Sequence, residues 1–241
     1  MRIVNIHDAA SPPDHPAPPP PRGLSRQDDA ATAPALQTRA LALYKAAAKG
    51  GVLTALNNVA TMYAAGHGTE QDLYAAAKYY DTAAELGDPV AMFTRADWHT
   101  RGKAGPVDDA AAFHWYEKAA EIGLPRAQFN TGTAYLNGKG TVRDHAKAAE
   151  FLRLAAERGM AEACVNLSEM CRLGMGMPDG EPRRDEARQW LEKAVGVGNE
   201  KAVEMAKNLL TVMDAEEEAV ALEEARLKKE AEEAEAAKGG R

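Results

Sequence analysis

The stretch Ala127–Gly159, AQFNTGTAYLNGKGTVRDHAKAAEFLRLAAERG, decides the fold because most of the chain repeats it. A stripe of small and apolar residues follows Ala127 at helical spacing, at Thr131, Ala134 and Tyr135. The glycines of GKG at 138–140 then break the helical pattern. The stretch therefore begins with a helix that ends in a glycine turn.

A second helix fills the rest of the stretch. Asp144 stands where an N-cap belongs, because its carboxylate can accept the free amide hydrogens of the next helix's first turn. The helical stripe behind it consists of Ala148, Phe151, Leu152, Ala155 and Ala156. Gly159 closes this helix, at a position where a positive φ favours glycine. The unit is thus a helical hairpin whose alanines allow close helix packing.

The same offsets recur every 36 residues. The opening alanine returns as Ala55, Ala91, Ala127, Ala163 and, after a three-residue insertion, Ala202. The aromatic residue of the second helix returns as Tyr79, Trp115, Phe151 and Trp190. The closing glycine returns as Gly51, Gly87, Gly123, Gly159 and Gly198. A fixed period of this length is typical of a solenoid built from one supersecondary unit.

The pattern A-x-x-x-L-G-x-x-Y-x-x-G-x-G-x-x-x-D-x-x-x-A-x-x-W-Y-x-x-A-A-x-x-G resembles the Sel-one-like repeat (SLR), a relative of the tetratricopeptide repeat, from Ala40 to about Leu210. The resemblance implies an all-α fold, a right-handed α-α superhelix of helical hairpins that serves mainly as a scaffold or adaptor. Two positions depart from the pattern. Ala104 replaces a turn glycine, and Arg183 replaces a capping aspartate. The insertion at 175–184 predicts the least regular corner.

Composition limits the partners and the compartment. The net charge of −7 over 241 residues argues against nucleic acid, since phosphate binding needs a basic face. No run approaches the ~18 apolar residues of a membrane span, and the start lacks the apolar region of a secretory signal. Cys164 and Cys171, ~10.5 Å apart along one helix, lie too far apart to pair. We expect a cytoplasmic protein with no membrane contact.

Three regions follow from these patterns. Residues 1–34 are proline-rich and expected to be disordered; they are either an SH3- or WW-type ligand or, as we favour, a linker. Residues 35–210 form the solenoid: a capping helix at 35–50, repeats at about 55–90, 91–126, 127–162 and 163–201, and a partial fifth repeat at 202–210. Residues 211–241 form a charged helix and tail.

Offsets four, seven and eleven of each first helix share one face, which we call the first-helix face and expect to line a concave groove outside the core. Its candidate partner-binding residues are Asn58, Thr61, Thr94, Asp97, Arg101, Asn130, Thr133, Asn137, Asn166 and Glu169. The recurring asparagines have two interpretations. They bind the backbone of an extended peptide, or they satisfy polar groups of the neighbouring repeat, which we favour.

The C-terminal helix continues the fifth first helix to about Lys238 and holds ten acidic and five basic residues from 211 onward. Met213, Val220, Leu227 and Ala234 recur every seven residues, but the partner positions of a coiled coil are glutamates. This pattern favours a solvated helix over a partner-binding one.

We find no catalytic, cofactor-binding or metal-ligating constellation in the sequence. No histidine or cysteine pair has metal-ligand spacing, and no S-x-x-K motif supports the β-lactamase activity ascribed to some proteins of the resembled family. The sequence predicts a non-catalytic scaffold that binds a protein or peptide in its groove. The alternatives are an enzyme or small-molecule-binding protein that uses the groove, or a regulatory subunit that acts through its charged C-terminal helix.

Overall fold

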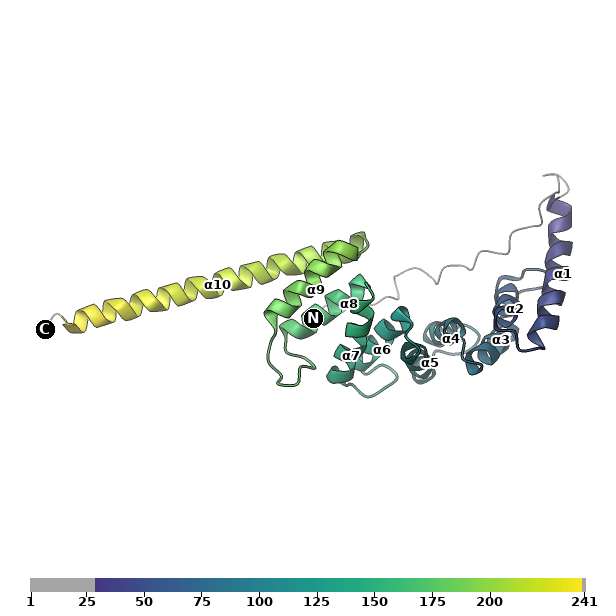
Figure 1. Ribbon diagram of the computed structural model, residues 1–241, viewed down its shortest axis with the longest axis horizontal. Helices are drawn as coiled ribbons and strands as arrows, with labels where there is room; N and C mark the ends of the chain where they lie inside the picture. The colour runs from purple at the N-terminus through teal and green to yellow at the C-terminus, as the bar shows by residue number, and fades with distance from the viewer. Residues whose placement is uncertain (1–28, 240–241) are drawn as a thin grey trace. The chain divides into compact units, whose positions relative to one another are not determined.

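The computed structural model describes residues 29–239, with side chains from 33 to 233. Over this part of the chain helices follow one another without any strand (Figure 1). They are α1 (Asp29–Ala48), α2 (Leu53–Ala65), α3 (Leu73–Glu85), α4 (Pro89–Arg101), α5 (Asp109–Glu121), α6 (Pro125–Asn137), α7 (His145–Glu157), α8 (Ala161–Arg172), α9 (Arg184–Val197) and α10 (Glu200–Gly239). The predicted all-α solenoid of helical hairpins is confirmed.

The chain divides into two compact units, the first ending at Ala155 and the second beginning at Ala156. We call them unit 1 and unit 2. In unit 1 each helix from α1 to α5 packs against the next one along the chain. In unit 2 α8 packs on α9, and α10 contacts both of them. Hairpins therefore stack on their sequence neighbours, as a repeat of this length requires.

The predicted aspartate caps are confirmed. Asp72, Asp108 and Asp144 each accept a hydrogen bond from the backbone N–H three residues further on, at 2.9, 2.9 and 3.0 Å. These bonds satisfy amides that have no partner inside the helix. Arg183, which replaces the aspartate before α9, makes no side-chain cap. The turn before α9 is also the longest between paired helices, at 173–183 against 66–72, 102–108 and 138–144.

Most closing glycines have the predicted left-handed backbone. Gly87, Gly123 and Gly159 have φ of +93°, +101° and +84°. The prediction is wrong for Gly198, whose φ is −78°. A Cβ at Gly198 would lie 2.6 Å from the Ala194 carbonyl oxygen, so close packing, and not backbone conformation, excludes a side chain there.

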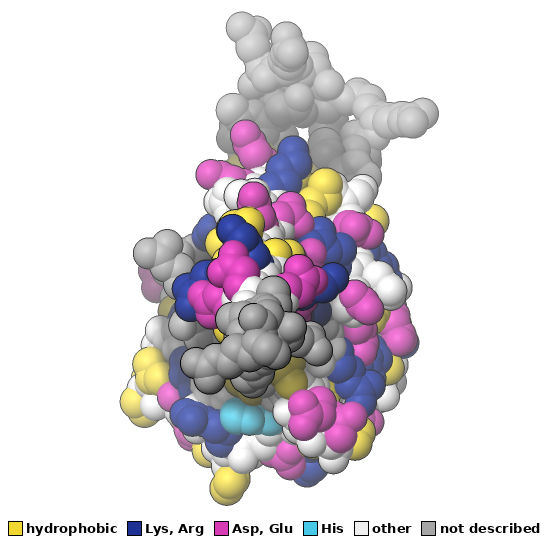
Figure 2. Space-filling model, turned by 90° about the vertical axis from the view of Figure 1, so that its left-hand side faces the viewer, with side chains coloured by type: hydrophobic (Ala, Val, Ile, Leu, Met, Phe, Trp, Pro, Cys, Tyr) yellow, Lys and Arg dark blue, Asp and Glu magenta, His cyan; other side chains and the backbone are white. Residues whose placement is uncertain are grey.

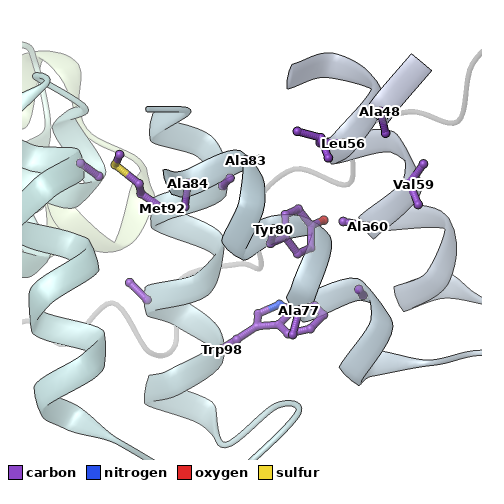
Figure 3. Close-up of a cluster of buried hydrophobic side chains, with 14 of the residues drawn as sticks. Ala48, Leu56, Val59, Ala60, Ala77, Tyr80, Ala83, Ala84, Met92 and Trp98 are labelled. Carbon is purple, nitrogen blue, oxygen red and sulfur yellow. The ribbon is translucent and has the colours of Figure 1, made fainter. Parts of the chain in front are cut away.

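Alanine and aromatic side chains build the core of unit 1 (Figure 3). Tyr80 of α3 meets Trp98 of α4 edge to face, with ring centroids 5.5 Å apart. Ala60, Ala96 and Gly132 occupy the same offset in successive first helices and are buried. A Cβ at Gly132 would lie 2.8 Å from the side chain of Leu152, so this row of small residues sets how closely paired helices approach.

The helix at the C-terminal end of the described chain was predicted correctly, whereas the start of the helix at the N-terminal end was not. The expected helix start at residue 35 is wrong, because α1 begins at Asp29 and includes Pro34. A proline in the second turn removes only one backbone hydrogen bond, near the end of a 20-residue helix. Residues 1–28, with the proposed SH3- or WW-type ligand, lie outside the described residues. At the other end α10 is continuous, as predicted, over 40 residues.

Candidate partner-binding face

The ten candidate residues of the first-helix face fall in both units. Eight of them lie on α2, α4 and α6 of unit 1, whereas Asn166 and Glu169 lie on α8 of unit 2. Each unit therefore has its own part of the first-helix face.

The expectation that these ten residues lie outside the core is wrong for four of them. Thr94, Asp97, Thr133 and Asn166 are buried, with at most 8% of their surface exposed. The half-buried members are Asn58, Thr61, Asn130 and Glu169, and the exposed members are Arg101 and Asn137. A first helix such as α4 packs against both α3 and α5, which covers more of its circumference than a surface helix with one apolar stripe.

The accessible part of the face on α4 is an ion pair. Arg101 Nε donates to Asp97 Oδ1 at 2.8 Å, one helical turn apart. Asp97 is nearly covered, while the Arg101 side chain keeps 31% of its surface exposed. The pair thus presents a guanidinium whose charge is balanced within the protein.

Tyrosine hydroxyls from the second helices reach the first-helix face. The Tyr80 hydroxyl lies 3.0 Å from Thr61 Oγ1, between α3 and α2. The Tyr116 hydroxyl on α5 is hydrogen-bonded by Thr100 of α4 and by Asn130 of α6. Asn130 therefore satisfies a polar group of the preceding repeat, which supports the structural interpretation of the asparagine at that position.

Burial keeps both hydroxyls protonated. It raises the pKa of Tyr80, against a smaller lowering by the hydrogen bond between Tyr80 and Thr61. Burial also raises the pKa of Tyr116, and the negative charge of Asp97 adds to the effect. At neutral pH these tyrosines remain neutral donors and acceptors that join one helix to the next.

In unit 2 the candidate glutamate is also paired. Arg172 donates two hydrogen bonds to Glu169, at 3.0 and 2.8 Å, and a third to Glu216 of α10 at 3.2 Å. Arg188 of α9 reaches Asp214 at 2.7 Å and Glu217 at 3.1 Å. These arginines hold the first half of α10, together with the buried Met213. From residue 217 to 233 every side chain of α10 is exposed.

Sequence reasoning missed a set of contacts between consecutive repeats, which we call the inter-repeat locks. Lys45 Nζ donates to the Tyr63 hydroxyl at 3.0 Å, and the Tyr135 hydroxyl donates to Glu117 at 2.6 Å. Both pairs are separated by 18 residues. The third lock joins Asp81 of α3 to Arg95 of α4. The signal that could have found them is a polar residue at one fixed second-helix offset facing a tyrosine of the next repeat.

The two aromatic locks share one packing arrangement. The Tyr63 ring stacks on Tyr79 with centroids 5.8 Å apart, and Tyr135 stacks on Phe151 at 6.0 Å. A lysine lies over each ring, Lys45 at 5.5 Å and Lys147 at 5.1 Å from the centroids. Cation–π contact and stacking therefore fix the tyrosine that each lock uses.

Charged side chains of both signs intermix on the face shown in Figure 2. Within residues 33–233, no group of three or more His, Cys, Asp or Glu side chains is placed to hold a metal ion. An open hollow of about 770 Å³ lies at the start of α9, in unit 2, and is lined by Pro182, Arg183, Arg184, Asp185, Glu186, Gln189 and Trp190. Among the described helices, none is long and apolar enough to cross a membrane.

Cys164 and Cys171, which were predicted not to pair, both lie on α8 and are buried thiols that form no disulfide. Burial raises the pKa of Cys164 to about 11, which keeps the thiol protonated and unreactive at neutral pH. Both residues therefore behave as small core side chains.

Stacked helical hairpins with a polar face on their first helices define a helical repeat protein of the solenoid class. The Sel1 repeat model matches residues 33–52, 53–88, 89–124, 125–160 and 161–196, well over half of the chain. The protein therefore belongs to the Sel1 repeat family, the family that the sequence pattern resembled. Its members are generally helical repeat scaffolds and commonly mediate protein–protein interaction.

Two solved structures support this membership. A Sel1 repeat protein from Oxalobacter formigenes is 35% identical, with a TM-score of 0.62, over 72% of this chain and 50% of that one. The protein c5321, a protective antigen of uropathogenic Escherichia coli with an SLR fold, is 33% identical, with a TM-score of 0.61, over 67% of this chain. This chain spans 34% of c5321, so the similarity concerns a part of that protein. No curated protein matches the sequence.

Proposed function

We propose that this protein is a non-catalytic scaffold that binds a protein or peptide partner along the first-helix face. The observation that carries the proposal is the strip of polar side chains that stays accessible on successive first helices of unit 1: Asn58 on α2, Arg101 on α4, and Asn130 and Asn137 on α6. A row of hydrogen-bonding groups suits an extended segment, whose main chain offers donors and acceptors along its length.

The charge of this strip bears on the kind of partner. Its ion pair, Asp97 with Arg101, is neutralised within the protein, and its other members are amides. Long-range attraction to a strongly charged partner is therefore weak, and binding should depend little on salt concentration. The partner we propose is an extended segment of low net charge.

The test is affinity capture with mass spectrometry from a lysate of the native host. The face variant Asn58→Arg/Asn137→Arg places two long cationic side chains on the strip. The control variant Thr82→Arg/His114→Arg adds two arginines at exposed positions on α3 and α5, which are second helices. We expect wild type and control to capture the same proteins and the face variant to lose them. Equal capture by all three would contradict the proposal.

A second candidate function rests on the exposed part of α10. Val220, Leu222 and Leu227 there expose 48%, 66% and 52% of their surface, which leaves apolar side chains for a partner. Deletion of residues 218–241 keeps the buried Met213 and the arginine contacts of Glu216 and Glu217. Loss of the captured proteins on this deletion, with capture retained by the face variant, would assign binding to α10 in place of the first-helix face.

A further inference from the structure

The inter-repeat lock between α3 and α4 differs in chemistry from the other two. His99 occupies the offset of the lock tyrosines Tyr63 and Tyr135. Arg95 occupies an offset that holds Val59 in the preceding repeat and is itself buried, with 9% of its surface exposed. A buried guanidinium needs partners that satisfy its donors. The groups that accept hydrogen bonds from Arg95 therefore determine the properties of this lock.

Arg95 contacts Asp81 on α3 and His99 one turn further along its own helix, α4. Its Nε donates to Asp81 Oδ1 on α3 at 2.5 Å, and its Nη2 lies 3.2 Å from Nε2 of His99. A guanidinium has donors only, so Nε2 of His99 must be the acceptor in this contact. An imidazole nitrogen accepts a hydrogen bond only when it carries no proton. The geometry thus requires a neutral His99.

Protonation of His99 would remove that acceptor and place a second cation beside Arg95. Three charged groups act on the imidazole: Arg95 on α4, Asp108 at the start of α5, and Asp81 on α3. Burial and the charge of Arg95 lower the pKa of His99, and they outweigh the opposite effect of the two carboxylates.

We propose that the contact between α3 and α4 is a pH-sensitive joint, closed while His99 accepts a hydrogen bond from Arg95 and loosened when mild acid protonates His99. The joint itself does not depend on the proposed function. Its consequence for partner binding does, because α4 also carries Asp97 and Arg101 of the first-helix face. Loosening of α4 against α3 would disturb that part of the strip.

The pH range follows from the direction of the shift. A histidine in the unfolded chain titrates near a pKa of about 6.5, and the folded value is lower. Between these two values the unfolded state binds more protons, so stability falls as pH falls. The stabilisation is complete above the unfolded pKa and is lost once pH drops below the folded one.

The decisive variant is His99→Tyr, which restores the residue of the other two locks; its hydroxyl can donate to Asp81 as Tyr135 donates to Glu117. Melting temperatures are measured at pH 7.5 and 5.5 for wild type, this variant and a control, His114→Gln, at an exposed histidine. We expect acidification to lower the melting temperature of wild type and control by at least about 2 °C more than that of His99→Tyr. If acidification lowers the melting temperature of all three proteins by the same amount, the proposal of a pH-sensitive joint is contradicted.

A second measurement titrates the wild-type protein itself. NMR titration of the histidine ring protons of wild type should place the midpoint of His99 below about 6.5. Its signal is assigned from the spectrum of a His99→Gln sample recorded at pH 7.5. A midpoint at or above that value would overturn the proposal, whatever the partner of the protein is.

Discussion

Tyrosine hydroxyls make many of the polar contacts between neighbouring helices of unit 1. Tyr80 meets Thr61, Tyr116 meets Asn130, and Tyr135 meets Glu117. The Tyr135 contact involves a charged acceptor at 2.6 Å, which makes it the strongest of the three by chemistry. Burial is the main cause that raises the pKa of Tyr135, and the hydrogen bond to Glu117 raises it further. This hydroxyl therefore stays protonated at physiological pH.

Tyr135→Phe should lower the free energy of unfolding by about 1–2 kcal/mol, because Glu117 loses its donor while the ring stacking on Phe151 remains. Urea denaturation of single and double variants with Glu117→Gln measures the coupling between the two residues. A coupling indistinguishable from zero would mean that the lock contributes nothing to stability.

Ala104 has a left-handed backbone, with φ of +56°, at the offset where Gly68 and Gly140 have +73° and +72°. A residue that has a side chain is destabilised by roughly 1–2 kcal/mol in the left-handed region. Glycine avoids this strain, but its greater conformational entropy in the unfolded chain offsets part of the gain. Ala104→Gly should therefore raise the free energy of unfolding by up to about 1 kcal/mol and the melting temperature by about 2–4 °C. A lower melting temperature would show that the methyl group makes contacts that outweigh the strain.

At the scale of the element, the hairpin is specified by its glycines, its aspartate caps and its small residues. These features were predictable because each rests on local chemistry: a cap needs a carboxylate, and a left-handed turn favours glycine. Which residues of each first helix are exposed was less predictable. Asp97 and Asn166 are polar and stand off the apolar stripe of their helices, so the sequence suggests that they are exposed. Both are buried, because a first helix contacts more than one neighbouring helix, and the pattern within one helix does not show these contacts.

Gly123→Val tests the hairpin turn. Gly123 has φ of +101° and lies in the turn between α5 and α6, where a β-branched residue is strained. We expect the free energy of unfolding to fall by about 1 kcal/mol or more. Gly196→Val in α9 is the comparison, since no heavy atom lies within 4 Å of a Cβ there and its φ is not positive. An unchanged melting temperature for Gly123→Val would contradict the turn assignment.

Gly198 and α1 show where local patterns fail at this scale. Gly198 continues the series of closing glycines in sequence, but it is needed for the close approach of Ala161 and Val203. The capping helix was expected to begin at residue 35, yet α1 begins at Asp29 and includes Pro34. At Gly198 the deciding contacts involve residues outside the repeat pattern that was used. The inter-repeat locks were missed for the same reason, since each joins offsets of two different repeats.

For the whole molecule, the repeat period predicted the solenoid class, the residue pattern within each repeat resembled one family, and the match to the Sel1 repeat model establishes that family. The period also implied that function belongs to a surface formed by successive repeats, and not to one pocket. The structure narrows this surface to the first-helix positions of unit 1 that packing leaves accessible, among them Asn58, Arg101, Asn130 and Asn137. The central claim is that a partner binds there.

The most direct test of that claim is the dissociation constant of the captured partner, measured by isothermal titration calorimetry at two salt concentrations. We predict that Asn58→Arg/Asn137→Arg weakens binding at least tenfold, a loss of about 1.4 kcal/mol, while Thr82→Arg/His114→Arg stays within about twofold of wild type. We also predict little change with salt for wild type. Equal affinities for both variants and wild type would contradict binding at the first-helix face.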